Sequence, residues 1–138
     1  MKNLLILCTG NSCRSQIAEG YFRSLGGDQL TVFSAGVETH GVNPRAIRVM
    51  AEDGIDISSH TSNHVDEFLH IPMDYVITVC DSARERCPVF PSTAEKFHQN
   101  FPDPAKATGS EEEIMREFTL VRDMIKEYTR DFIEKHIL

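Results

Sequence analysis

The sequence predicts a single α/β domain over residues 1–138, built as a three-layer sandwich around a four-stranded parallel sheet. Short apolar runs alternate with segments of helical periodicity, and turn-forming residues separate them. A chain of 138 residues can bury one sizeable core but is too short for two ordinary domains. The alternation of strands and helices implies parallel strands joined by right-handed crossovers.

The first half of the chain supplies two of these strands and two helices. Residues 4–7 form a continuous apolar run that ends at a polar loop, as in a strand buried on both faces. A helix is expected over 17–25, where apolar residues recur at helical spacing and a glycine pair follows. A second strand is expected over 30–34, and a second helix over 44–53 with a proline in its first turn.

The second half supplies the remaining elements. Residues 75–79 are rich in β-branched side chains and predict a strand that ends at a cysteine, as the first strand does. Prolines between 87 and 109 break any long helix and leave a short strand at 95–98. From Ser110 onward, apolar residues at alternating steps of four and three predict one long amphipathic helix that begins at that serine.

Composition and charge exclude several classes of function. The net charge of −7 argues against nucleic acid and against anionic lipid, since both select clustered lysine and arginine. No apolar run approaches the roughly 20 residues that span a bilayer. The N-terminus leads into the first loop without a cleavage site, so we expect a cytoplasmic protein. In a reducing compartment, four cysteines indicate redox or metal chemistry before structural disulfides.

The segment CTGNSCRS, from Cys8 to Ser15, has the spacing of an oxyanion-binding loop. It follows a strand and opens a helix, which is where parallel sheets bind ligands. The backbone N–H groups of such a loop can curl inward around a tetrahedral dianion, and an arginine closes the cradle. The expected binding residues are Thr9, Gly10, Asn11, Ser12, Cys13 and Arg14.

Cys8 is the candidate nucleophile of this loop. The helix N-terminus and Arg14 should lower the pKa of its thiol from about 8.5 and so favour the reactive thiolate. Ser15 either donates a hydrogen bond to that thiolate or caps the helix. The plainer alternative is that Cys8 is a buried strand-end cysteine and Arg14 a surface residue, which the complete loop disfavours. Cys13 is interpreted as a packing residue whose side chain points away from the anion.

The loop resembles the signature of the low-molecular-weight tyrosine phosphatase superfamily, which includes the thioredoxin-coupled arsenate reductases. The segments Ser34-Ala35-Gly36 and Asp103-Pro104 match further signatures, and the resemblance to the reductases runs nearly end to end through SAGVETHGVNP, DISSHTS and DPAKATG. It implies a flavodoxin-like fold, arsenate as substrate with phosphate or sulfate as analogues, and thioredoxin as partner. It also implies that Asp103 is the general acid, although an Asp-Pro pair is usually only a turn.

The presence of Cys80 and Cys87 favours an arsenate reductase over a phosphatase. Hydrolysis of a thiophosphate needs only water, whereas reduction of arsenate needs two electrons from a second thiol. We expect Cys8 to attack arsenate, Cys80 to attack Cys8, and Cys87 to attack Cys80. On an intact helix Cys80 and Cys87 would lie about 10.5 Å apart, beyond the roughly 7 Å that a disulfide tolerates. Residues 81–86 are therefore predicted to be helical when reduced and rearranged when the bond forms.

Metal binding is not assigned with certainty. The cysteines lack zinc-ligand spacing, and the six histidines are isolated and receive no catalytic role. The resemblance implies a potassium ion near Asn11, Glu19, Ser34 and Thr61, but Asn63 replaces a carboxylate of the relatives. No tightly bound cofactor is expected, and the protein is expected to be a monomer. Two other functions stay open: a phosphatase with redox-regulated cysteines, and a non-enzymatic oxyanion or redox-sensing module.

Overall fold

The computed structural model describes residues 1–81 and 88–138, and its elements follow the predicted order. The strands are β1 (Lys2–Cys8), β2 (Leu30–Gly36), β3 (Tyr75–Thr78) and β4 (Glu95–His98). The helices are α1 (Arg14–Gly26), α2 (Pro44–Glu52) and α3 (Glu111–His136). Three short 3-10 helices are η1 (Gly27–Gln29), η2 (Val65–Phe68) and η3 (Pro104–Lys106). Residues 82–87 lie outside the description, and with them most of the predicted redox-dependent helix.

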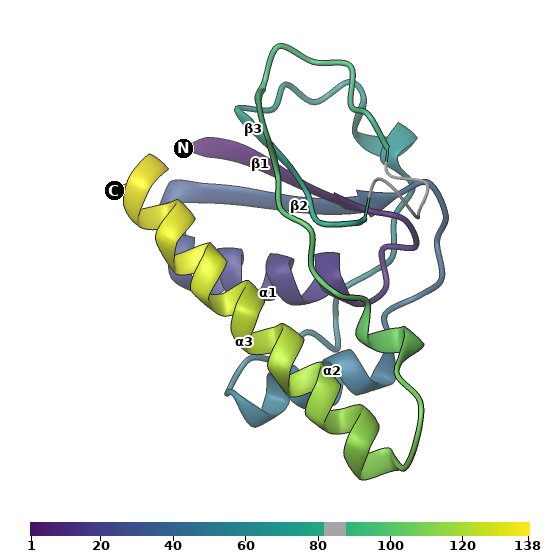
Figure 1. Cartoon of the computed structure of the whole chain (residues 1–138). Helices are drawn as coiled ribbons and strands as arrows, with labels where there is room; N and C mark the ends of the chain where they lie inside the picture. The colour runs from purple at the N-terminus through teal and green to yellow at the C-terminus, as the bar shows by residue number, and fades with distance from the viewer. Residues whose placement is uncertain (82–87) are drawn as a thin grey trace.

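The sheet is parallel and four-stranded, as predicted, with the order β2-β1-β3-β4. Leu7 of β1 is paired with Ala35 of β2 on one side and with Thr78 of β3 on the other. The carboxyl ends of these three strands therefore meet at one edge of the sheet. The N- and C-termini lie together at the opposite end (Figure 1).

Strand β1 is buried on both faces, which explains its continuous apolar run. Leu4 and Ile6 belong to the core on the helical face, whereas Leu5 and Leu7 belong to a second cluster on the opposite face. This division follows from the two-residue period of a strand. Cys8 continues the first set, so its side chain lies on the helical face of the sheet.

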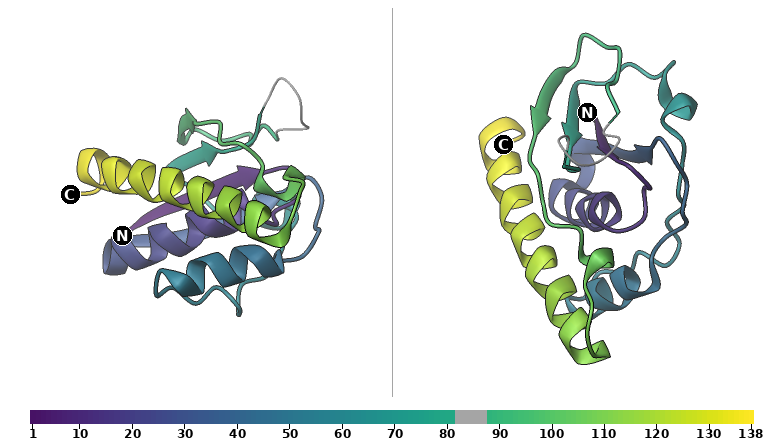
Figure 2. Two further views of the ribbon diagram at one scale, coloured as in Figure 1. Left: turned by 60° about the horizontal axis from the view of Figure 1, so that its bottom comes forward. Right: turned by 45° about the vertical axis from the view of Figure 1, so that its right-hand side comes forward.

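Helices α1, α2 and α3 lie on the same face of the sheet (Figures 1 and 2). Phe22 of α1 meets Phe132 of α3 edge to face, with ring centroids 5.5 Å apart. In the part of the chain that the structure describes, the opposite face is covered by η2 and by irregular segments, through Val65, Met73 and Phe90. The third layer is therefore mostly non-helical in this region.

Helix α3 begins where the sequence predicts. The Ser110 hydroxyl accepts a hydrogen bond from the Glu113 N–H at 3.1 Å, and the Glu113 carboxylate accepts one from the Ser110 N–H at 3.3 Å. This reciprocal capping satisfies two N–H groups at the helix start. Among the 132 described residues, no helix combines the length and apolarity that crossing a bilayer requires.

A buried tyrosine joins the three helices through one carboxylate. The Tyr21 hydroxyl donates to Asp53 at 2.6 Å, and the Lys126 ammonium contacts the same oxygen at 2.9 Å. The hydrogen bond from Tyr21, and then the one from Lys126, hold the pKa of Asp53 below its ordinary value. Because Asp53 follows α2 while its partners lie on α1 and α3, the ionised carboxylate stabilises the packing of all three helices.

Replacing Asp53 should therefore destabilise the protein in a pH-dependent way. A carboxyl whose pKa is lowered by folding stabilises above its unfolded value of about 3.9, and this contribution is lost as the pH falls through the folded pKa. Asp53→Asn should lower the free energy of unfolding by about 1–2 kcal/mol at pH 7, measured by urea denaturation. The deficit should shrink toward pH 3, while Asp131→Asn on the exposed side of α3 should cost little at either pH. An Asp53→Asn deficit that did not depend on pH would contradict this account.

Candidate active site

The predicted oxyanion loop connects the end of β1 at Cys8 to the start of α1 at Arg14. A cavity of about 340 Å³ opens above it. Its lining comes from the loop, from the segment after β2 and from η3, through Cys8, Thr9, Gly10, Ser12, Cys13, Arg14, His40, Asp103, Ala105 and Lys106. The structure therefore brings most of the predicted site residues together at the carboxyl edge of the sheet.

The carbonyl groups of the loop are held by donors outside it. The Glu38 N–H donates to the Thr9 carbonyl, and the His40 N–H donates to the Gly10 carbonyl, both at 3.0 Å. The Gln16 side-chain amide donates to the Asn11 carbonyl, and the Asn43 N–H donates to the Ser12 carbonyl, both at 3.1 Å. Because the two ends of a peptide group point in opposite directions, this arrangement turns N–H groups of the loop toward the pocket. N–H groups that point into a pocket are the hydrogen-bond donors that a bound anion requires.

Asn11 is the buried centre of this arrangement. Its φ of 49° lies in the left-handed region, which asparagine tolerates better than most residues do. Its side-chain amide donates to the hydroxyls of Ser15 at 2.9 Å and Ser34 at 3.0 Å, and its oxygen accepts from the Asn63 N–H at 2.7 Å. Asn11 thus shapes the loop from behind, in addition to lying within it.

Ser15 does not cap α1, so that alternative is wrong. The cap position is Cys13, which makes no side-chain capping bond. The buried Ser15 hydroxyl instead accepts a hydrogen bond from Asn11. The hydrogen of the Ser15 hydroxyl therefore points away from Asn11 and stays available for donation to another group.

Arg14 and Asp103 form the charged wall of the pocket. The Arg14 guanidinium is almost fully buried, donates to the Phe101 carbonyl at 3.2 Å, and lies 3.7 Å from an Asp103 oxygen. The other Asp103 oxygen accepts a bond from the Ala105 N–H at 3.0 Å. Asp103 is therefore both a turn residue and a pocket residue, so the two interpretations of the Asp-Pro pair are compatible.

The cysteines differ in state and surroundings. Cys8 and Cys13 are thiols, whereas Cys80 is disulfide-bonded, and Cys87 lies outside the described residues. The Val79 N–H donates to the carbonyl of Leu7 at 2.9 Å, which extends the pairing of β1 with β3 toward Cys80. Cys8 and Cys80 therefore lie just at or beyond the ends of neighbouring strands, as predicted, and both are buried.

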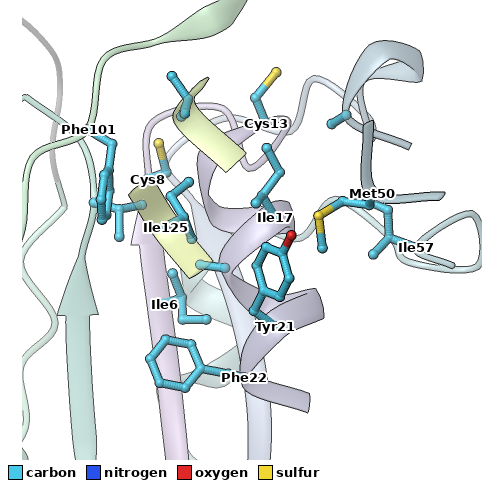
Figure 3. Close-up of a cluster of buried hydrophobic side chains, with 14 of the residues drawn as sticks. Ile6, Cys8, Cys13, Ile17, Tyr21, Phe22, Met50, Ile57, Phe101 and Ile125 are labelled. Atoms are coloured by element: carbon cyan, nitrogen blue, oxygen red, sulfur yellow. The ribbon is translucent and has the colours of Figure 1, made fainter. Parts of the chain in front are cut away.

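Cys13 fits its interpretation as a packing residue. It belongs to the helical-face core, although it also borders the cavity. Burial, followed by the negative charge of Asp103, raises the pKa of its thiol to about 12. Figure 3 shows Cys13 above Ile17 at the start of α1, whereas Cys8 lies beside Phe101 and Ile125 at the end of β1.

The residues implied for potassium gather behind the loop, but their oxygens already have protein partners. One Glu19 oxygen accepts from the Ser34 hydroxyl at 2.5 Å, and the other accepts from the Arg23 guanidinium at 2.8 Å. The Thr61 carbonyl accepts from the Gln16 amide at 3.0 Å. Because Arg23 already balances the charge of Glu19, this arrangement does not fit a monovalent cation.

Asn63 does not restore the missing carboxylate ligand. Its side-chain oxygen accepts from the Thr61 hydroxyl at 2.8 Å, and its amide donates to Glu67 at 3.1 Å. Its backbone N–H donates to the Asn11 side chain and so reaches the loop. Over residues 1–81 and 88–138, no group of three or more His, Cys, Asp or Glu side chains is placed to hold a metal ion.

Two histidines were missed by sequence reasoning. His40 borders the pocket, and His60 lies behind the loop with its Nδ1 3.0 Å from the Gln16 side-chain oxygen. Burial lowers the pKa of His60. The predicted topology could have indicated His40, because this residue follows the second strand. Residues that follow parallel strands share one edge of the sheet.

The fold and this loop define a class of parallel α/β proteins that bind oxyanions around a buried cysteine. The chain belongs to the low molecular weight phosphotyrosine protein phosphatase family, whose model matches residues 3–137.

Among its relatives, an arsenate reductase from Halalkalibacterium halodurans is 49% identical, covering 96% of each chain. An arsenate reductase from Bacillus subtilis is 46% identical, covering 97% of this chain and 98% of the relative. A solved arsenate reductase in the phosphate binding state is 34% identical, with a TM-score of 0.85 over the full length of both chains. A tyrosine phosphatase from Erwinia amylovora shares the fold, at 16% identity with a TM-score of 0.78 over 98% of this chain and 93% of its own.

Gly36 should be essential to the shape of the loop. A Cβ at this position would overlap the Thr9 carbonyl and would come within 3.0 Å of the Asn11 nitrogen. Gly36→Ala should therefore weaken the binding of inorganic phosphate at least about 10-fold, measured by calorimetry, because backbone cannot give way as a flexible side chain can.

Gly41→Ala is the matched control for this prediction. Its added Cβ meets nothing within 4 Å, although the φ of 79° makes the substitution strained. It should therefore cost stability while affecting phosphate affinity much less. Equal loss of affinity in the two variants would sink the steric explanation.

Proposed function

We propose that this protein reduces arsenate to arsenite, with Cys8 as the nucleophile and Cys80 and Cys87 as a disulfide relay that thioredoxin regenerates. The observation that carries the proposal is the placement of Cys8 at the end of β1, where it lines the pocket, and of the buried Cys80 just beyond the end of the adjacent parallel strand β3. The disulfide-bonded state of Cys80 supports its redox role. The arsenate reductases among the relatives support the choice of substrate.

The first step is attack of the Cys8 thiolate on arsenic. A sulfur–arsenic bond forms, and one arsenate oxygen leaves with a proton that Asp103 supplies from its place in the pocket wall. Arg14 and the inward-facing N–H groups stabilise the charge on the remaining oxygens. Ser15, oriented by Asn11, donates to the thiolate before attack.

The second step is the reduction itself. Cys80 attacks the Cys8 sulfur, so a disulfide forms, the sulfur–arsenic bond breaks, and its electron pair reduces As(V) to As(III). Cys87 then attacks Cys80, which releases the Cys8 thiolate and leaves a Cys80–Cys87 disulfide. A thioredoxin dithiol supplies the two electrons that reduce this bond. Such a cycle requires a compartment that keeps thiols reduced, which is why we place it in the cytoplasm of the cell, carried out by a monomer.

A weak phosphatase activity is the second candidate function, and the family supports it. Phosphate and arsenate are close in shape and charge, so the same loop would favour attack on either. A thiophosphate at Cys8 is then cleared by water. This activity would need Cys8 and Asp103 but neither Cys80 nor Cys87.

Cysteine variants should separate the two activities. Cys8→Ser should abolish arsenite production in an assay coupled to thioredoxin, thioredoxin reductase and NADPH, because the nucleophile is lost. Cys87→Ser should abolish multiple turnovers of arsenate while sparing hydrolysis of p-nitrophenyl phosphate. Hydrolysis then serves as the internal control for folding, and sustained arsenate turnover by Cys87→Ser would refute the relay.

Potassium should have little effect on this protein. We propose that the contact between Arg23 and Glu19 supplies the charge balance that a cation would otherwise provide behind the loop. Exchanging KCl for NaCl at constant ionic strength should therefore change kcat/KM for arsenate by less than about 2-fold, where a bound ion would stabilise the native site by mass action. A specific activation by potassium would show that the Arg23 contact yields to the ion.

A further inference from the structure

The oxyanion pocket has two unlike walls whose residues have no role in the proposed reaction. His40 forms one wall, from the segment after β2, and Ala105 and Lys106 of η3 form the other. In an in-line displacement, the departing oxygen lies opposite the attacking sulfur. Any group esterified to that oxygen must therefore leave the pocket between these two walls.

The His40 wall is attached to the loop through its backbone. Its backbone N–H donates to the Gly10 carbonyl at 3.0 Å, and its ring lies so close to Gly10 that an added Cβ would come 2.5 Å from Nδ1. Its Nε2 lies 3.0 Å from a Glu38 oxygen, which holds the ring from the other side. The backbone bond holds His40 against the loop, and moving the half-exposed ring aside would break its contact with Glu38.

The Lys106 wall supplies charge. The chain carries a net charge of −7, which repels a dianion from most of the surface. The cavity lining differs in composition, because it gathers two cationic side chains, Arg14 and Lys106, with one carboxylate, Asp103. Lys106 is exposed and also borders the adjoining hollow beside Asp103, so this residue lies at the edge of the pocket, toward solvent.

We propose that His40 and Lys106 are specificity-determining residues. Lys106 draws a small oxyanion dianion to the pocket, and the His40 ring, positioned against Gly10, obstructs the side chain of an organic ester. The selected substrate class is therefore the inorganic tetrahedral dianion. This inference rests on the proposed function for its biological meaning, but it concerns anion binding and is measured without turnover.

The test compares two ligands by calorimetry on the reduced full-length protein. Inorganic phosphate is the small dianion, and phenylphosphonate is a non-hydrolysable dianion with a bulky group. Lys106→Gln should weaken phosphate binding roughly 3–10-fold at low ionic strength, and the loss should fall below about 2-fold at 0.5 M NaCl, because exposed charges are screened. Lys96→Gln, an exposed lysine of β4 outside the pocket lining, is the matched control and should change neither value.

His40→Ala should change selectivity more than affinity. Phosphate binding should stay within about 3-fold of the wild type, while phenylphosphonate binding should tighten roughly 10-fold as the wall is removed. Lys106→Gln behaving like Lys96→Gln, or an unchanged ligand ratio in His40→Ala, overturns the proposal. If these shifts occur but no arsenite is produced, the proposed function fails and the specificity assignment stands. If arsenite is produced without these shifts, the specificity assignment fails and the proposed function stands.

Discussion

The placement of β1 between β2 and β3 is the constraint on which the site depends. It brings the segments that follow three strands to one edge of the sheet, and each has a separate task there. The segment after β1 binds the anion, and the segment after β2 turns the loop carbonyls outward through the N–H groups of Glu38 and His40. The segment after β3 carries Cys80, which is disulfide-bonded in this structure. None of these tasks requires a long-range rearrangement of the core, because parallel pairing has already set the three strand ends side by side.

The negative charge of Glu19 behind the loop is balanced by neighbouring side chains. Glu19 is almost fully buried, and an unpaired carboxylate there would oppose an anion in the pocket. Arg23 and the Ser34 hydroxyl satisfy its two oxygens, and the His60 ring lies 3.7 Å from it. The network therefore holds Asn11 and Ser15 in position without adding net negative charge beneath the anion. The structural support of the loop and its electrostatics are served by the same few side chains.

The elements and the central loop could be predicted because each leaves a periodic or spaced pattern. The apolar run of β1, the stripe of α3 and the CTGNSCRS spacing are all local features of the sequence. His40 and His60 could not be assigned in the same way, because they lie in irregular segments where no period fixes the direction of a side chain. The role of Ser15 was ambiguous for a related reason. Only the tertiary contact with Asn11 shows that its hydroxyl is engaged behind the loop and does not cap the helix.

In the proposed reactions, the choice between hydrolysis and reduction depends on whether water or the Cys80 thiol reacts first with the intermediate on Cys8. Both reactions share the attack by Cys8, so a loop that favours this step favours both. Water competes best where the intermediate is open to solvent, yet Cys8 is only 3% exposed and Cys80 is fully buried. Once the Cys80 disulfide is reduced, its thiol at the end of the adjacent strand would have a high effective concentration near Cys8, whereas a water molecule would have to enter the pocket from solvent. In the proposed cycle, burial and proximity would therefore favour sulfur over water, without any change to the loop that captures the anion.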